Sequence, residues 1–143
     1  MLKPYMILLT LLVCTFPLIA QDNQTPAQAP ASGSSAIPAD AAQKANPVKP
    51  TAESLAQGKK YYGYDCAMCH GDNGNGKGEV AISEKMKVGD FSDPATLQGK
   101  TDGDLFYIIK NGHGQMPPEG DRVKPTEIWN MVNYVRSLSK KGQ

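Results

Sequence analysis

The sequence predicts an all-α domain in which three to five helices are separated by long glycine-rich loops. Three observations lead to this fold class. Apolar side chains after residue 51 recur three and four residues apart, which is the spacing of one helix face. Residues that cap helices stand immediately before these stretches. No stretch alternates between apolar and polar residues for long enough to predict a strand.

Residues 1–20 have the layout of a secretory signal peptide. Lys3 supplies the positive charge, an apolar stretch of about 15 residues follows, and Ala20 ends it before the polar Gln21. A membrane span requires about 20 apolar residues, so this stretch is short for a span. We therefore expect an exported, periplasmic protein with a cleaved signal, and retention of the segment as a membrane anchor is the alternative.

Residues 21–50 differ in composition from the chain that follows them. They contain eight Ala, five Pro, four Gln and three Ser but no aromatic residue, and their four charges cancel. Such a segment buries too little apolar surface to offset the conformational entropy that ordering would cost. We predict a disordered linker, acting either as a tether or as an inert tail, and place the folded domain at residues 51–143.

The first helix is predicted to begin after Thr51, whose hydroxyl can accept a hydrogen bond from a free N–H group of the first turn. Its inward face follows helical spacing and comprises Leu55, Gly58, the stem of Lys59 and Tyr62. A short second helix is predicted from Pro94, a residue favoured in the first turn. Ser92 or Asp93 would cap this helix, which ends near Gly99.

A third helix is predicted to follow Thr101, because Asp104 stands three residues on and completes a capping box. Its apolar stripe ends before Gly112 and comprises Leu105, Ile108 and Ile109. Thr126 is predicted to cap the last helix. The inward face of that helix comprises Ile128, Met131, Val132, Val135 and Leu138.

Charge and cysteine content exclude two classes of protein. Lys3 is the only charged residue in the signal, so the other 14 basic residues balance 14 acidic residues. A protein that binds nucleic acid by neutralising phosphates needs a basic surplus, so nucleic acid is not an expected partner. A framework of several disulfides is excluded too, because only three cysteines occur and Cys14 lies in the signal. The chemistry is therefore expected at Cys66 and Cys69.

Residues 66–70 read Cys-Ala-Met-Cys-His and match the pattern of covalent haem attachment. At this spacing, Cys66 and Cys69 can add to the two vinyl groups on one edge of the porphyrin, and His70 can then ligate the iron. A redox disulfide is a second interpretation, although such a pair normally lies beside a strand-then-helix unit. Zinc bound by these three residues and His113 is a third, with a spacing that fits no usual finger. We predict one covalently bound haem c.

Nearly all of the predicted domain resembles the class I cytochromes c, which carry a single haem. In that family a glycine, three residues, an aromatic residue and three further residues precede the haem motif, and here Gly58, Tyr62 and Cys66 stand at those positions. The resemblance implies a small cytochrome c fold in which the first and last helices cross closely at the glycine. The last helix would contribute packing side chains to this crossing, here Met131 and Tyr134.

The resemblance also implies that a methionine followed by proline is the distal ligand of the haem iron. Met116 matches this pattern, 46 residues after His70, in a loop stiffened by Pro117 and Pro118. His113 is the competing ligand, because it lies three residues away and imidazole binds iron well. The other interpretations are a solvated loop histidine for His113 and a gap-filling methionine for Met116.

Residues 71–78 form a glycine-rich loop that is similar to a phosphate-binding loop. Gly78, however, stands where such a loop needs Ser or Thr to hold magnesium. In the cytochromes c this loop wraps the proximal side of the haem, and many members carry a proline just after it that helps to provide a partner for the axial histidine. Glu79 stands there in this chain, so the sequence does not specify the partner of the His70 ring.

Together these features predict an electron carrier that passes single electrons between redox proteins outside the cytoplasm, membrane respiratory complexes in particular. With His70 and Met116 both on the iron, no position is open for a substrate, so we expect no enzyme activity. The first alternative is a permanent haem c subunit of a larger oxidase, dehydrogenase or reductase complex. Further alternatives are a haem-based sensor or peroxidase in which Met116 is displaced, and a haem-free dithiol oxidoreductase.

Overall fold

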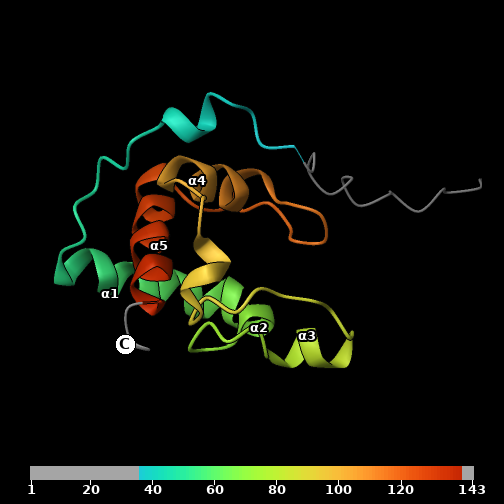
Figure 1. Ribbon diagram of the computed structural model, residues 1–143. Helices are drawn as coiled ribbons and strands as arrows, with labels where there is room; N and C mark the ends of the chain where they lie inside the picture. Colours follow the sequence, from blue (N-terminus) through green and yellow to red (C-terminus); the bar gives the residue numbers. More distant parts are fainter. Residues whose placement is uncertain (1–35, 140–143) are drawn as a thin grey trace, which may run out of the picture. The chain divides into compact units, whose positions relative to one another are not determined.

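The structure, a computed structural model, describes residues 36–139, so the predicted signal peptide and half of the predicted linker lie outside the described residues. The described part folds into helices joined by loops and contains no strand, which confirms the predicted all-α class. None of its helices is long and apolar enough to cross a membrane. Its α-helices are α1 (Ala52–Tyr61), α2 (Ala67–His70), α3 (Glu79–Ser83), α4 (Asp102–Asn111) and α5 (Pro125–Leu138) (Figure 1).

Three short helical segments of other kinds connect these α-helices. They are the 3-10 helix η1 (Ala41–Gln43), the π-helix η2 (Tyr62–Cys66) and the 3-10 helix η3 (Pro94–Leu97). The last of these is the short helix predicted after residue 93, and Asp93 caps it by accepting a hydrogen bond from the Ala95 N–H at 2.9 Å.

The capping residues place the starts of α1 and α4 as the sequence predicts. The Thr51 hydroxyl accepts a hydrogen bond from the Ser54 N–H at 3.2 Å. At α4 the Thr101 hydroxyl accepts from the Asp104 N–H at 3.1 Å, and the Asp104 carboxylate accepts in return from the Thr101 N–H at 2.8 Å. This reciprocal pair is the predicted capping box.

The start of α5 corrects one prediction. Thr126 does not cap this helix, because the helix already begins at Pro125 and Thr126 is an exposed residue of its first turn. Proline is favoured there because its missing N–H would be unpaired in any case. The Glu127 carboxylate accepts a hydrogen bond from the Lys124 N–H at 2.8 Å. The predicted inward face is confirmed, since all of its members are buried: Ile128, Met131, Val132, Val135 and Leu138.

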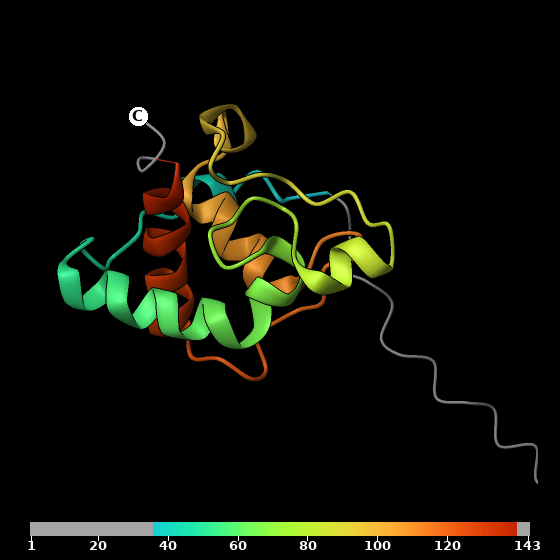
Figure 2. The ribbon, with the colours of Figure 1, turned by 90° about the horizontal axis from the view of Figure 1, so that it is seen from below.

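The close crossing of α1 and α5 organises the core, and Figure 2 shows the two helices in contact. Gly58 makes this approach possible, because a Cβ atom there would lie 2.1 Å from the Asn130 carbonyl oxygen and 2.7 Å from the Tyr134 Cβ. The rings of Tyr62 and Tyr134 meet edge to face at 5.2 Å beside the crossing. Lys59 is exposed as a whole residue, and the inward placement of its stem stays a prediction.

Residues 36–50, which we call the strap, lie against the helices although the sequence places them in the linker. The strap passes over α4 through η1 (Figure 1), where Ala41 is 1% exposed. Gly103 of α4 allows this contact, because a Cβ atom there would lie 1.9 Å from the Ala41 carbonyl oxygen. Ordered packing therefore begins before the predicted boundary at Thr51.

A buried amide joins the strap to α1 and α5. Asn133 of α5 donates from its Nδ2 to the Val48 carbonyl oxygen at 3.0 Å and to the Ser54 hydroxyl at 2.9 Å. Its Oδ1 accepts a hydrogen bond from the Asn46 side chain at 2.8 Å. Three segments that are distant in the sequence therefore share one polar side chain inside the protein.

Candidate functional site

A cavity of about 370 Å³ opens on the side of α2 that faces the loop after α4. This volume lies within the range of sites that bind a cofactor or small molecule, and the lining is mainly apolar as in such sites. Its walls are formed by side chains from η2, α2, residues 86–91, η3, α4, the loop after α4 and α5. Four of the sequence-predicted site residues line it together: Cys66, Cys69, His70 and Met116.

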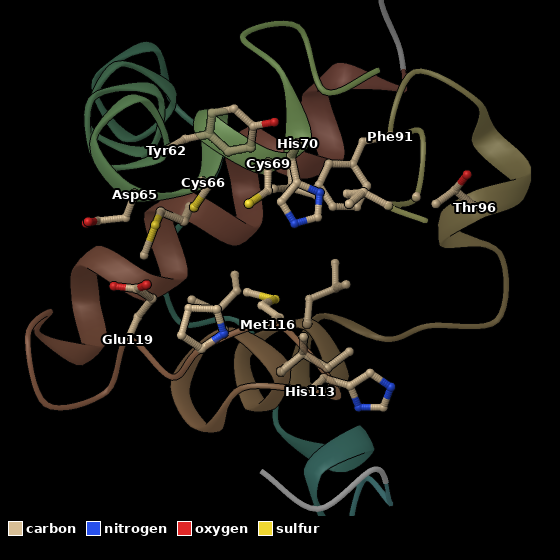
Figure 3. Close-up of a pocket in the computed structure, with 18 of the residues that line it drawn as sticks. Tyr62, Asp65, Cys66, Cys69, His70, Phe91, Thr96, His113, Met116 and Glu119 are labelled. Carbon is tan, nitrogen blue, oxygen red and sulfur yellow. The ribbon is translucent and has the colours of Figure 1, made fainter. Parts of the chain in front are cut away.

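The π-helix η2 and the single turn of α2 position the haem-motif residues. A π-turn of this kind is uncommon and is frequently found at functional sites. It places Cys66 and Cys69 on one wall of the cavity with His70 beside them (Figure 3). Both cysteines are half-buried and neither forms a disulfide.

The Cys66 thiol stays protonated at neutral pH. Burial raises its pKa to about 12, and the nearby carboxylates of Glu119 and Asp65 act in the same direction. Dithiol oxidoreductases need the opposite environment, one that lowers the pKa of the attacking thiol. The haem-free dithiol interpretation is therefore disfavoured.

His70 and Met116 lie on opposite sides of the cavity and face each other in Figure 3. Burial lowers the pKa of the His70 ring, and the nearby backbone of Gly89 partly opposes this shift. The ring is therefore neutral at physiological pH, which is the form that binds a metal. The Phe91 ring stacks on it at 4.6 Å with 18° between the planes. Among the described residues, His70 Nδ1 is the one buried side-chain nitrogen or oxygen without a hydrogen-bond partner.

A tight turn after α4 presents Met116 to the cavity. The His113 N–H donates to the Met116 carbonyl oxygen at 3.0 Å, and the Met116 N–H donates to the His113 carbonyl oxygen at 3.0 Å. Gly112 precedes this turn with φ of 77°, and a Cβ atom there would lie 2.6 Å from the Met116 carbonyl oxygen. The His113 side chain is exposed and its ring points away from His70 (Figure 3).

The glycine-rich loop after α2 packs closely on the backbone of the haem motif. The Gly76 N–H donates to the His70 carbonyl oxygen at 2.8 Å, and the Gly78 N–H donates to the Cys69 carbonyl oxygen at 3.1 Å. A Cβ atom on Gly78 would lie 2.3 Å from the Met68 carbonyl oxygen. The loop therefore fixes the backbone that carries Cys69 and His70.

Two cavity residues were missed by the sequence analysis, Glu119 and Phe91. Glu119 is 3% exposed although glutamate is almost never buried without a partner. Arg122 is that partner and contacts both carboxylate oxygens at 2.7 Å while also contacting Asp65 at 3.2 Å. An arginine three residues after the glutamate was the available signal.

The zinc interpretation finds no support in this geometry. Nowhere in the described part of the chain do three or more His, Cys, Asp or Glu side chains gather as a metal ion would require. His113, the fourth ligand of that interpretation, turns away from His70. The predicted zinc alternative therefore fails because its four ligands do not converge.

The residues that line the cavity fit a haem c. Two thiols lie on one wall, a neutral imidazole adjoins them, and a thioether sulfur faces that imidazole across an apolar space. Glycines stand where a Cβ atom would collide with the backbone beside the cavity, at Gly78 against α2 and at Gly112 against the loop that carries Met116. The donor set consists of one sulfur and one imidazole nitrogen, which suits haem iron.

Comparison with protein families and known sequences agrees with this fit. Residues 53–135 match the family model described as "Cytochrome C oxidase, cbb3-type, subunit III". The chain is 37% identical over 84 residues to the cbb3-type cytochrome c oxidase subunit FixP of Bradyrhizobium sp. (strain ORS 278), which covers 58% of this chain and 27% of FixP. It is 33% identical over 84 residues to cytochrome c6 of Cladophora glomerata, covering 59% of this chain and 88% of cytochrome c6. The chain thus spans about a quarter of FixP and most of cytochrome c6.

Solved structures that are similar to this chain also include a c-type cytochrome. A chain of the Kuenenia stuttgartiensis reducing HAO-like protein complex Kustc0457/Kustc0458 is similar with a TM-score of 0.57 and 28% identity, covering 64% of this chain and 46% of that chain. The KustC0563 c-type cytochrome is similar with a TM-score of 0.51 and 27% identity, covering 57% of this chain and 95% of that chain. The fold around the cavity is therefore shared with c-type cytochromes.

Proposed function

The chain belongs to the class I cytochromes c, in the family described as subunit III of the cbb3-type cytochrome c oxidase, and we propose that four of its residues hold the haem c. Cys66 and Cys69 would hold the haem covalently through thioether bonds, each thiol adding across one vinyl group. His70 would be the proximal ligand and Met116 the distal ligand of the iron. The observation that carries this proposal is the opposition of His70 and Met116 across one apolar cavity that both cysteines also line.

The protein's function is electron transfer, and the proposed ligands suit it. The bound haem c supplies a one-electron couple between ferric and ferrous iron. In this proposal His70 and Met116 would both hold the haem iron, which would leave no place on it for a substrate. The thioether of Met116 favours the ferrous state and raises the reduction potential relative to a second imidazole. The apolar walls limit the access of water and so reinforce this preference.

The ligand assignment is tested with protein matured in a haem-attaching host. We expect haem that resists acid-acetone extraction and, in the oxidised protein, the weak near-red absorption band of a sulfur-to-iron bond. Met116→Ala should abolish that band while covalent haem remains, and His70→Ala should yield little stable holoprotein. His113→Ala is the matched control, because it removes a potential ligand from the same turn.

Two outcomes would contradict the assignment. Extractable haem would show that Cys66 and Cys69 do not form thioethers. Loss of the near-red band in His113→Ala, together with its retention in Met116→Ala, would move the distal ligand to His113.

Between the two electron-transfer roles, a mobile carrier and a permanent subunit, we propose the carrier. The match extends over 88% of cytochrome c6, so a single domain of this kind makes up nearly the whole of that relative. The second candidate function is a permanent subunit of an oxidase complex, and the 37% identity to the oxidase subunit FixP supports it. Purification in mild detergent distinguishes them: we expect the cytochrome to separate from oxidase activity on size exclusion, whereas stable co-migration with it would favour a subunit.

We further propose that the protein is exported and that residues before the strap hold it near a membrane, where respiratory complexes are its redox partners. The support is the signal-like layout of residues 1–20 and the low-hydropathy composition of residues 21–35. A tether of this kind raises the local concentration of carrier at a neighbouring complex. Cell fractionation with N-terminal sequencing tests it: we expect some membrane-associated protein that keeps residues 1–20. Wholly soluble protein that begins near Gln21 would exclude the anchor.

A further inference from the structure

A buried carboxylate stands at the cysteine edge of the cavity and is not used by any ligand role. Glu119 lines the cavity and is 3% exposed, and Figure 3 shows it on the same side as Cys66 and Asp65. Thr96 lines the cavity too and lies on the side opposite Glu119 in Figure 3. Glu119 is therefore a charge placed inside the pocket wall rather than on the outer surface.

The surrounding groups keep this carboxylate in place, and Arg122 favours its charged form against the effect of burial. The Arg122 Nη2 donates to both carboxylate oxygens at 2.7 Å, and hydrogen bonds between charged groups are among the stronger ones. Arg122 also donates to Asp65 of η2 at 3.2 Å. The Glu119 N–H donates to the Ile109 carbonyl oxygen at 2.9 Å, which fixes the backbone position of the residue. Asp65 and Arg122 are the titratable groups that face it, since the proposed thioether leaves Cys66 without a thiol proton.

The charges of this cluster differ in how strongly water screens them. The Arg122 side chain is 57% exposed, whereas the Glu119 side chain is 5% exposed. Exposed charges interact weakly over distance because water and salt screen them, and buried charges are screened much less. A group bound in the cavity therefore experiences the negative charge of Glu119 more than the positive charge of Arg122.

We propose that Glu119 tunes the reduction potential of the haem c, by stabilising the ferric form and so lowering the potential. This inference rests on the proposed function. One-electron reduction, with the electron supplied by a redox donor protein, removes one unit of positive charge from the pocket. Glu119 attracts that positive charge, so its carboxylate favours the oxidised state. Glu119 acts here through its charge alone, since it is not a ligand of the iron.

The test is redox titration of the holoprotein with Glu119→Gln, which removes the charge and keeps the shape. We expect the equilibrium constant for reduction to rise about tenfold, which for one electron is about 59 mV. Asp121→Asn is the matched control, because it removes a carboxylate from an exposed position of the same loop. We expect less than a twofold change for Asp121→Asn. Glu119→Asp should restore most of the wild-type potential.

Two further measurements test the proposal where Glu119→Gln folds poorly. They are the reduction potential of Arg122→Gln and the pH dependence of the wild-type potential. Arg122→Gln removes the counter-charge, so at pH 9 it should lower the potential relative to wild type. Burial raises the pKa of Glu119 and Arg122 opposes this, so the wild-type potential should fall as Glu119 ionises with rising pH. Glu119→Gln should lack that step while it keeps the near-red band, which a merely structural role would not predict.

The outcomes separate this inference from the proposed function. A Glu119→Gln potential within twofold of wild type in equilibrium constant, or an equal change in Asp121→Asn, would overturn the tuning role. A rise in potential in Arg122→Gln at pH 9 would overturn it as well. Absence of covalent haem in the wild-type protein would instead overturn the proposed function.

Discussion

In the helical frame, formed by α1, α4 and α5, side chains pack against one another. Backbone contacts backbone instead in the loops that hold the haem motif and Met116, residues 71–78 and 112–124, which we call the pocket loops. The frame contains the stacked rings of Phe106 and Trp129, whose centroids are 4.1 Å apart. The pocket loops depend instead on glycines with positive φ and on hydrogen bonds such as that from the Gly76 N–H to the His70 carbonyl oxygen.

This difference separates the sources of stability and function. Apolar side chains of the frame bury one another, so the frame contributes to stability through protein atoms alone. The apolar lining of the pocket meets no protein side chain across the cavity, and haem c is the group that fits there. Changes in the frame should therefore alter stability with little effect on the potential, and changes in the pocket should alter haem chemistry first.

The largest effect is expected from a change in the pocket that removes the proposed attachment of haem. Replacing both Cys66 and Cys69 with Ala removes the proposed covalent link to haem. We expect loss of holoprotein and, because a domain of this size has a thin core, loss of most helical structure. Haem staining of denatured protein and far-ultraviolet circular dichroism measure the two losses.

The control for this variant is Met68→Ala, which changes an exposed side chain between the two cysteines. Covalent haem and helix content should be retained there. Undiminished helical structure in the double cysteine variant would show that the frame folds without its cofactor.

The next largest effect is expected from a substitution in the frame that separates α1 and α5 at their crossing. Gly58→Val places a side chain where even a Cβ atom would lie 2.1 Å from the Asn130 carbonyl oxygen, so the helices must separate. We expect a loss of about 3 kcal/mol in the free energy of unfolding, with the midpoint potential of the folded fraction unchanged. Gly63→Val is the control, because a Cβ atom on Gly63 would meet nothing within 4 Å. Equal melting temperatures for the two variants would contradict the close crossing.

The frame was largely predictable from the sequence because local signals determine it. Thr51 and Thr101 fix the starts of two helices through their own hydroxyls, and helical spacing marks the buried face of α5. The start of α5 was misplaced because Thr126 was given more weight than Pro125, which is the stronger first-turn signal. Gly58 was identified through the resemblance to a family, since spacing alone does not reveal which helix approaches a glycine.

The strap and the electrostatics of the pocket could not be predicted in the same way. The strap is held by two isolated apolar residues, Ala41 and Val48, and by hydrogen bonds of the Val48 carbonyl oxygen and the Asn46 amide. None of these contacts forms a periodic hydrophobic pattern. The burial of Glu119 depends on how the loop after α4 folds back beside Cys66, which is a long-range contact. Local sequence predicts short-range contacts, and these two features arise from distant ones.

The third prediction tests whether the strap belongs to the frame. Asn133→Ala leaves the Ser54 hydroxyl and the Val48 carbonyl oxygen without their buried partner. We expect a loss of about 2 kcal/mol in the free energy of unfolding, and an unchanged potential. Asn111→Ala, which removes one hydrogen bond within α4, should cost about 1 kcal/mol or less. Equal costs for the two variants would show that the strap adds nothing to the stability of the frame.

The smallest expected effect compares one carboxylate from each region through the pH dependence of stability. The Tyr61 hydroxyl and the Lys124 N–H donate to Glu127 of α5 and lower its pKa, whereas burial raises the pKa of Glu119 in the pocket. Glu127 therefore contributes stability above its ordinary pKa that is lost as pH falls through the lowered value. Ionised Glu119 acts in the opposite direction, because the folded state binds its proton more tightly than the unfolded state does.

Denaturant unfolding of oxidised holoprotein between pH 3 and 8 measures how the stability contribution of each carboxylate changes with pH. The free energy of unfolding of wild type relative to Glu127→Gln should decrease as pH falls, because the variant lacks a carboxylate that the folded state prefers ionised. The same difference relative to Glu119→Gln should decrease as pH rises, because only wild type must ionise a buried carboxyl group. Each variant also loses hydrogen bonds. That loss shifts the free energy of unfolding equally at every pH, so it does not change how the two differences depend on pH. Slopes of the same sign would show that Glu119 and Glu127 experience similar surroundings, against the contrast between pocket and frame.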